Sequence, residues 1–112
     1  MIEVIEAGPL TSVQTASGRP AWRHAGVPVG GAADAWSARL ANRLTGNDDD
    51  ASLLEITLGG ARLRFDEAAV IAVTGGTRVT MGGIDLPAAT AVALRAGSQL
   101  SVEYGDGARG YL

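Results

Sequence analysis

The sequence predicts a mainly β domain, built as an antiparallel barrel or sandwich with one short α-helix. Runs in which apolar and polar residues alternate are short and frequent, above all after residue 52, and this period of two is typical of strands. The 16 glycines among 112 residues indicate many tight turns between these runs. One segment alone has the period of a helix.

The first third of the chain predicts two short strands followed by a long loop. Residues 2–7 alternate apolar and acidic side chains until Gly8-Pro9 interrupts them, and residues 12–15 form a second, shorter candidate. Residues 16–33 are rich in glycine and proline and have no clear period. A loop of this length is uncommon unless it is functional or disordered, so we expect it to line a site.

The helix is predicted over residues 35–45. Asp34 is a suitable N-cap, and Gly46 can take the left-handed position that ends a helix. The large apolar residues recur every four positions and form one stripe that we expect to be buried, with smaller residues beside it: Trp36, Leu40 and Leu44, then Ala33, Ser37 and Ala41.

A β-hairpin is predicted where residues 53–58 and 61–65 meet at Gly59-Gly60. A two-residue turn there pairs the apolar residues on one face and places Glu55 opposite Arg64 on the other. Further strands are expected at residues 70–74, 92–94 and 100–104, and a second hairpin joins residues 77–81 to 84–86. The run 70–74 is nearly all apolar, so we expect it to be buried on both faces.

The end of the chain predicts a domain that is incomplete at its C-terminus. Residues 110–112 have the composition of the start of a strand. A strand that stops there is expected to leave an open sheet edge, and open edges promote association.

The composition excludes several kinds of site within this chain. It has 0 cysteines, 1 histidine and no lysine, which excludes a thiolate nucleophile, a P-loop lysine and a biotin attachment point. One histidine cannot build a His-based metal site, so no metal is expected. The net charge of −3 with scattered arginines predicts no nucleic-acid surface. No apolar run approaches the ~20 residues of a membrane helix, and a cytoplasmic location is expected.

Two residues of the long loop region are candidates for catalysis. Asp34 stands at the positive end of a predicted helix, where it either caps the helix or orients a substrate. His24 is a possible general base, although no carboxylate partner is visible near it in the sequence. The pair Gly75-Gly76 is either a turn between strands or a backbone cradle for an anion.

Seven sequence blocks, in this order and spacing, resemble the N-terminal signature of the 5-oxoprolinase C-subunit family, also called allophanate hydrolase subunit 2. The blocks are residues 10–14, 18–20, 26–28, 31–34, 40–44, 46–47 and 54–60. The resemblance implies a cyclophilin-like β-barrel, with residues 1–112 as the N-terminal portion of a carboxyltransferase-like domain. Three positions of the loop depart from the family's usual residues, namely Thr15, Ala21 and Gly30.

The resemblance also implies a function and a set of partners. It implies one component of an ATP-dependent 5-oxoprolinase, a hydrolase that opens 5-oxoproline to glutamate together with A-type and B-type subunits, the latter similar to allophanate hydrolase subunit 1. ATP is then used by the assembled complex, and biotin, if present, is carried by a partner. Arg19, Gly30 and Gly31 are the expected substrate-binding residues, beside the catalytic candidates His24 and Asp34.

Two other functions stay open at this point. One is a carboxyltransferase component that acts on urea or a related amide. The other is a non-catalytic interaction domain that antagonises a kinase inhibitor. The loop distinguishes them, because an enzyme needs polar groups in a concave pocket, whereas an interaction domain needs an exposed apolar patch.

Overall fold

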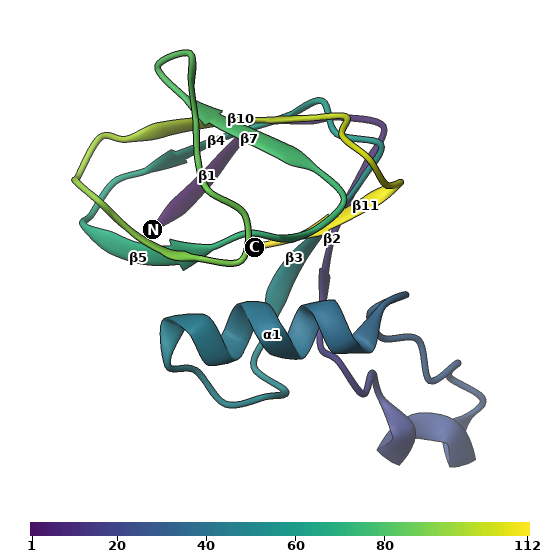
Figure 1. Ribbon diagram of the computed structural model, residues 1–112. Helices are drawn as coiled ribbons and strands as arrows, with labels where there is room; N and C mark the ends of the chain where they lie inside the picture. Colours follow the sequence, from purple (N-terminus) through teal and green to yellow (C-terminus); the bar gives the residue numbers. More distant parts are fainter.

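The computed structural model describes residues 1–112 and is mainly β, as the sequence predicts (Figure 1). The first sheet is antiparallel and has the order β1-β4-β10-β7-β8. Its strands are β1 (Ile2–Ala7), β4 (Ala61–Phe65), β10 (Gln99–Glu103), β7 (Arg78–Met81) and β8 (Ile84–Asp85).

Two smaller antiparallel sheets complete the β part of the fold. The second sheet has the order β2-β3-β11-β6 and the third pairs β5 with β9. Their strands are β2 (Leu10–Gln14), β3 (Leu53–Thr57), β11 (Arg109–Tyr111), β6 (Thr74–Gly75), β5 (Ala69–Ala72) and β9 (Ala91–Leu94). The hydrogen bonds divide the strands among three sheets, so the ring of strands in Figure 1 is not a closed barrel. The expected term β-barrel therefore describes the fold only loosely.

The strands surround one main hydrophobic core. Ten buried residues from all three sheets pack there, and the most completely buried of the large ones are Phe65, Ile56, Leu63 and Leu100. A second, smaller cluster lies between the helix and the second sheet. The helix therefore stands outside the ring and covers one side of it (Figure 1).

The expected hairpin at Gly59-Gly60 is wrong, because β3 and β4 lie in different sheets. Leu58, Gly59 and Gly60 all have positive φ angles, of 61°, 68° and 76°. Three left-handed residues in a row carry the chain around a corner instead of folding it back. β4 is thus central between β1 and β10, and its alternation is as predicted, with Ala61, Leu63 and Phe65 buried.

The corner also separates the expected ion pair of Glu55 with Arg64. Arg64 Nη2 lies 2.8 Å from Glu3 Oε2 on the neighbouring edge strand. Glu55 lies in the second sheet and is buried toward the helix side.

The helix α1 (Ala35–Thr45) has the predicted bounds, and Gly46 ends it with φ 78°. The expected burial of its large apolar stripe is wrong. Trp36 is 72% exposed, Leu40 and Leu44 are half-buried, and the residues buried are small or polar: Ser37, Ala38, Ala41 and Asn42. The Thr74 hydroxyl donates a hydrogen bond of 2.7 Å to the Ser37 carbonyl, and so close an approach of helix and sheet leaves room only for small side chains.

The later strands agree with the sequence except in two places. The second hairpin is confirmed, with Met81 paired to Ile84 across Gly82-Gly83. The run 70–74 is buried on both faces as expected from Ile71 to Thr74, and only Val70 departs, being 55% exposed. The terminal strand β11 lies between β3 and β6 and is therefore not the open edge that we expected.

The long loop forms a protruding arm, which we define as residues 17–31. It contains a 3₁₀-helix, η1 (Pro20–Ala25), none of whose residues is buried. At its base the Ala32 N–H donates to the Thr15 carbonyl at 2.9 Å, and Ser17 hydrogen-bonds Asp50. Figure 1 shows the arm extending beyond the N-terminal end of α1 and away from the strands. No helix of the chain is long and apolar enough to cross a membrane.

Candidate functional site

A pocket of roughly 280 Å³ lies where the start of α1 meets β6 and β11. Charged and aromatic side chains line it together with glycines, which leave backbone exposed in its wall. Its lining residues are Ala33, Asp34, Gly75, Gly76, Gly107, Ala108, Arg109 and Tyr111. Of the pockets in this chain, it is the one that contains the predicted residue Asp34.

Asp34 caps α1 with both oxygens of its carboxylate. Oδ1 accepts the N–H groups of Trp36 and Ser37, each at 3.1 Å, and Oδ2 accepts the Ser37 hydroxyl at 2.5 Å. The hydroxyl and N–H of Ser37, with the Trp36 N–H, hold the pKa of Asp34 below its usual value against a smaller opposing effect of burial. The predicted cap is confirmed, and a carboxylate so occupied is a weak base that serves to position the loop.

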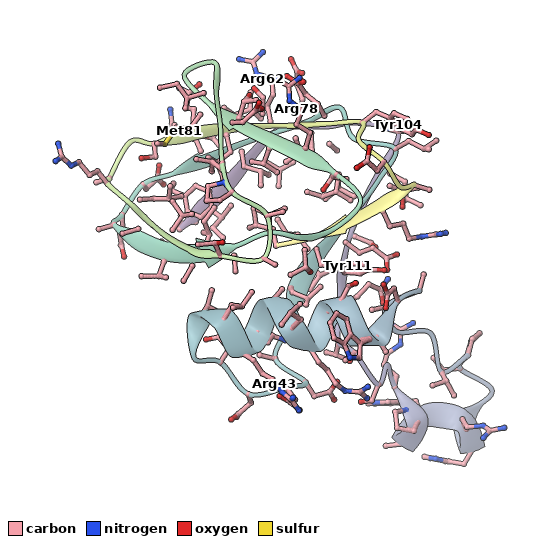
Figure 2. The ribbon with its side chains drawn as sticks, in the orientation of Figure 1. Arg43, Arg62, Arg78, Met81, Tyr104 and Tyr111 are labelled. Carbon is pink, nitrogen blue, oxygen red and sulfur yellow. The ribbon has the colours of Figure 1, made fainter.

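Tyr111 forms the floor of the pocket and is 1% exposed. Figure 2 shows it between the strands and α1. Its hydroxyl oxygen accepts the Asp34 N–H at 2.8 Å. Burial, with a further contribution from the neighbouring Glu55 carboxylate, raises the pKa of Tyr111 to about 12, although the Asp34 N–H opposes this.

Stability at alkaline pH should depend on Tyr111. The folded state holds the phenol proton more tightly than the unfolded state, because the pKa rises from 10.0 to about 12. This contribution is complete below pH 10 and is lost as the pH rises to about 12, a loss of roughly 2.7 kcal/mol. Tyr111→Phe should lower the stability at pH 8 by about 1–2 kcal/mol, since the Asp34 N–H loses its acceptor. The stability of this variant should, however, decrease less than that of the wild type between pH 10 and 12.

Urea unfolding at pH 8, 10 and 12 measures both effects. Tyr104→Phe is the control, because Tyr104 is 65% exposed. If the stability of wild type and of Tyr111→Phe decreased equally between pH 10 and 12, this would contradict the raised pKa of Tyr111.

A buried carboxylate and a half-exposed guanidinium stand beside Tyr111. Glu55 is 7% exposed and pairs with Tyr111 across β3 and β11. Its Oε2 accepts the Ala33 N–H at 2.8 Å, and its Oε1 lies 3.7 Å from Arg109 Nε. The Arg109 side chain is 46% exposed, so the pocket presents a cation to solvent while the carboxylate that anchors it stays buried.

The other predicted site residues lie on the arm and do not line this pocket. Arg19 lies within the arm, where its N–H donates to the Val29 carbonyl at 2.6 Å, and its guanidinium lies against Gly30. His24 is exposed in η1. The structure thus brings Arg19 and Gly30 together and places Asp34 in the pocket, while His24 and Gly31 take separate positions along the arm.

Sequence reasoning missed Arg109 and Tyr111 as pocket residues, and Glu55 as the buried carboxylate beside them. Arg109 and Tyr111 are about 75 residues from Asp34 in the sequence. They lie two positions apart on β11, and no local pattern predicts which strands pair with β11. The available signal was Gly75-Gly76, which does form one wall of the pocket. The Gly76 N–H donates to the Arg109 carbonyl at 2.8 Å, so it supports strand pairing and is not free to cradle an anion.

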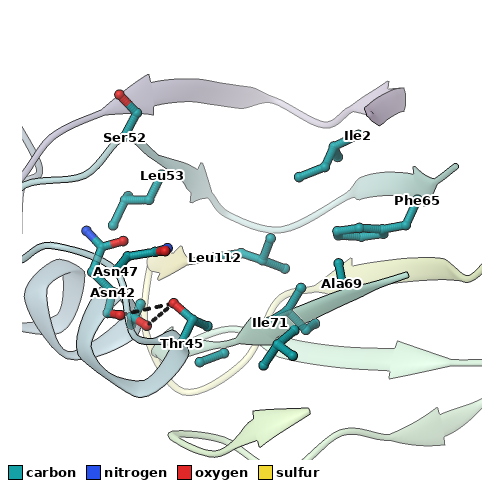
Figure 3. A pocket seen from close by; sticks show the side chains of 13 residues that line it. Ile2, Asn42, Thr45, Asn47, Ser52, Leu53, Phe65, Ala69, Ile71 and Leu112 are labelled. Atoms are coloured by element: carbon teal, nitrogen blue, oxygen red, sulfur yellow. Dashed lines mark hydrogen bonds between the residues drawn. The ribbon is translucent and has the colours of Figure 1, made fainter. Parts of the chain in front are cut away.

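A second pocket, of roughly 170 Å³, lies between the C-terminal half of α1, β5 and the two chain ends (Figure 3). Its lining is mainly apolar and contains no charged residue. The Thr45 hydroxyl is bonded to the helix carbonyls of Ala41 and Asn42. This pocket offers hydrophobic contact and no acid, base or cation. Nowhere in the chain do three or more potential metal ligands converge.

Comparison with known protein families gives a match over most of the chain. Residues 25–112 match the family described as "Carboxyltransferase domain, subdomain A and B". Urea amidolyase of Saccharomyces cerevisiae is 42% identical over 99% of this chain and 6% of its own length. The C subunit of the 5-oxoprolinase of Escherichia coli is 43% identical over 67% of this chain and 24% of its own length.

Solved structures agree with the sequence relatives. The Kluyveromyces lactis urea amidolyase superposes with a TM-score of 0.91 at 39% identity, over 98% of this chain and 7% of that one. The protein TTHA0988 superposes with a TM-score of 0.90 at 36% identity, over 98% of this chain and 23% of that one. The chain spans at most 24% of the length of the curated relatives that it matches.

Proposed function

The chain belongs to the carboxyltransferase domain family, subdomain A and B, and we propose that it is the C-type component of an ATP-dependent 5-oxoprolinase. Together with A-type and B-type partner subunits it opens 5-oxoproline to glutamate. In this reaction the lactam C–N bond breaks, the carbonyl carbon gains the oxygen of water and the nitrogen gains a proton. ATP is consumed by the assembled complex, because this chain has no lysine for a P-loop.

The observation that carries the proposal is the Arg109 guanidinium at the pocket. 5-Oxoproline has a carboxylate, and a guanidinium binds a carboxylate through two parallel hydrogen bonds. The start of α1 borders the same pocket, but Asp34 already accepts the Trp36 and Ser37 N–H groups there, so the positive charge comes from Arg109. The three glycines of the wall let a small ring approach the backbone.

The other site residues have supporting roles in this proposal. Asp34 holds the start of the helix and the pocket rim in place through its cap. Arg19, His24, Gly30 and Gly31 contribute from the arm in the assembled complex, with Arg19 as a second cation for the substrate. His24 is then the candidate for proton transfer at the lactam nitrogen.

The alternative is carboxyl transfer to urea or a related amide, with biotin carried by a partner. It is favoured by the extent of one match, since the yeast urea amidolyase aligns with 99% of this chain and the bacterial 5-oxoprolinase component with 67%. The two substrates differ in charge. Urea has no carboxylate, so it needs no cation at Arg109.

The test is ATP-dependent glutamate release from 5-oxoproline by the full-length chain with both partners. Arg109→Ala should raise KM about tenfold, because one charge-assisted contact at a half-exposed site is worth about 1.5 kcal/mol. Arg95→Ala is the control, since Arg95 is exposed in the turn between β9 and β10. Unchanged KM in Arg109→Ala, or carboxylation of urea without glutamate release, would contradict the proposal.

Asp34 is tested in the same assay with a matched pair of variants. Asp34→Asn keeps a capping oxygen and removes the charge, whereas Asp34→Ala removes both. If positioning is its role, Asp34→Asn should retain most activity and Asp34→Ala should lose it severalfold. A wild-type rate in both would restrict Asp34 to helix capping.

A further inference from the structure

Glu55 is the only charged residue of the chain that is buried, with an exposed fraction of 7%. A carboxylate in such a place is costly unless its partners compensate the charge. The other carboxylates that form ion pairs all lie near the surface, where at least 41% of each side chain is exposed. We therefore expect a specific role for the contacts that Glu55 makes.

The two oxygens of the Glu55 carboxylate contact two segments that border the pocket. Oε2 accepts the Ala33 N–H at 2.8 Å, and Ala33 directly precedes the residue that caps α1. Oε1 lies 3.7 Å from Nε of Arg109. Glu55 pairs with Tyr111 in the register of β3 and β11, so Arg109 is its diagonal neighbour, at a spacing that long side chains can bridge. One buried carboxylate thus joins the start of α1 to the cation of β11.

The contact with Glu55 leaves the far end of the Arg109 guanidinium for another partner. It involves Nε, whereas the two Nη groups have four of the five N–H donors of the side chain. The Arg109 side chain is 46% exposed, and the residue lines the pocket. A guanidinium that is held at Nε can therefore donate parallel hydrogen bonds from its Nη groups to a second carboxylate.

We propose that Glu55 is the positioning residue of this pocket, which holds Arg109 in one direction so that its Nη groups bind the carboxylate of the substrate. The inference rests on the proposed function for the identity of that substrate. A half-exposed arginine without a partner has many rotamers, and a ligand that binds it must first order it, which lowers the affinity. With Glu55 in place, the side chain is already ordered in the free protein.

NMR relaxation of the Arg109 Nε–H group tests the positioning itself, in the ¹⁵N-labelled chain of 112 residues without substrate or partners. Its order parameter should exceed about 0.6, the value below which a group is flexible. Arg95, which is exposed in the turn between β9 and β10, should lie below this value.

Two variants of Glu55 should lower the order parameter of Arg109 to that of Arg95. Glu55→Asp keeps the charge but retracts the carboxylate by one C–C bond, about 1.5 Å, so that it no longer reaches both partners. Glu55→Gln keeps an acceptor for the Ala33 N–H and removes the charge, on which the attraction across 3.7 Å depends. The second variant gives the answer if the first does not fold.

Kinetics of the full-length chain with both partners test the effect on the substrate. Glu55→Asp should raise KM for 5-oxoproline about fivefold and leave kcat within about twofold, because the freed arginine must be ordered on binding. The charge of the site is unchanged, so the effect reports the position of Arg109. In the Arg109→Ala background the same substitution should leave KM unchanged, since Glu55 acts through Arg109.

Val102→Ala is the control for a loss of stability alone. Val102 is 2% exposed in the main core and does not line the pocket. This variant should unfold at a lower urea concentration than the wild type, yet its KM should be that of the wild type.

Two outcomes would overturn the inference. The first is an Arg109 order parameter in the wild type no higher than that of Arg95. The second is a Glu55→Asp substitution that raises KM equally with and without Arg109, which would make Glu55 a stabilising residue only. An unchanged KM in Arg109→Ala would instead contradict the proposed function, and the order parameters would still decide whether Glu55 positions Arg109.

Discussion

Gly110→Ala should destabilise the chain by about 4 kcal/mol or prevent folding, an overpacking effect above the usual range of about 1–3 kcal/mol. A Cβ atom at this position would overlap Thr77 Oγ1 and lie 2.7 Å from Thr77 Cβ. Rotation of the threonine removes the first clash but not the second, since Cβ is fixed to the backbone. Gly110 is also the centre of β11, so the strand cannot move without disturbing β3 and β6.

Thermal and urea unfolding measure this effect. For a domain of this size about 4 kcal/mol corresponds to a decrease in Tm of more than about 15 °C. Gly82→Ala is the control, because nothing lies within 4 Å of its Cβ position and only its positive φ of 58° is unfavourable, which costs about 1 kcal/mol. The double variant Thr77→Gly with Gly110→Ala should recover much of the loss. A Gly110→Ala protein as stable as Gly82→Ala would show that the contact is looser than described.

Glu55→Ala should cost about 3 kcal/mol, the second largest effect that we expect. The Ala33 N–H loses its acceptor, the Tyr111 hydroxyl loses its neighbouring carboxylate, and Arg109 loses its partner. Unsatisfied groups in a buried site each cost about 1–3 kcal/mol. Glu55→Gln keeps an oxygen for the Ala33 N–H and should therefore cost about 1 kcal/mol.

Glu3→Ala is the matched control for Glu55. Glu3 pairs with Arg64 at 2.8 Å, but the two side chains are 48% and 46% exposed. A surface ion pair of this kind contributes less than about 1 kcal/mol. Equal losses of stability in Glu3→Ala and Glu55→Ala, measured by urea unfolding, would contradict the burial of Glu55.

The same comparison explains why the site was only partly predictable. The alternation of residues 53–58 predicts that Glu55 belongs to a surface ion pair. Alternation along a strand does not show which face of that strand meets a helix. Asp34 was found because capping is a local signal. Arg109 and Tyr111 reach the pocket only through the position of β11 between β3 and β6.

Local interactions determined what could be derived from the sequence alone. The helix bounds, the Asp34 cap, the Gly46 end and the β7–β8 hairpin all depend on residues within a few positions of one another. Such signals act through hydrogen bonds between near neighbours, which the order of residues specifies directly.

Tertiary structure alone decided which sheet each strand joins and which side of α1 is buried. Leu58, Gly59 and Gly60 turn the chain from one sheet to the other, and the close contact of Ser37 with Thr74 selects the small side of the helix. Both choices depend on how distant segments fill one core at high packing density, which hydrophobic periodicity does not encode. The outward position of Trp36 and the approach of Arg109 to Asp34 follow from these two choices.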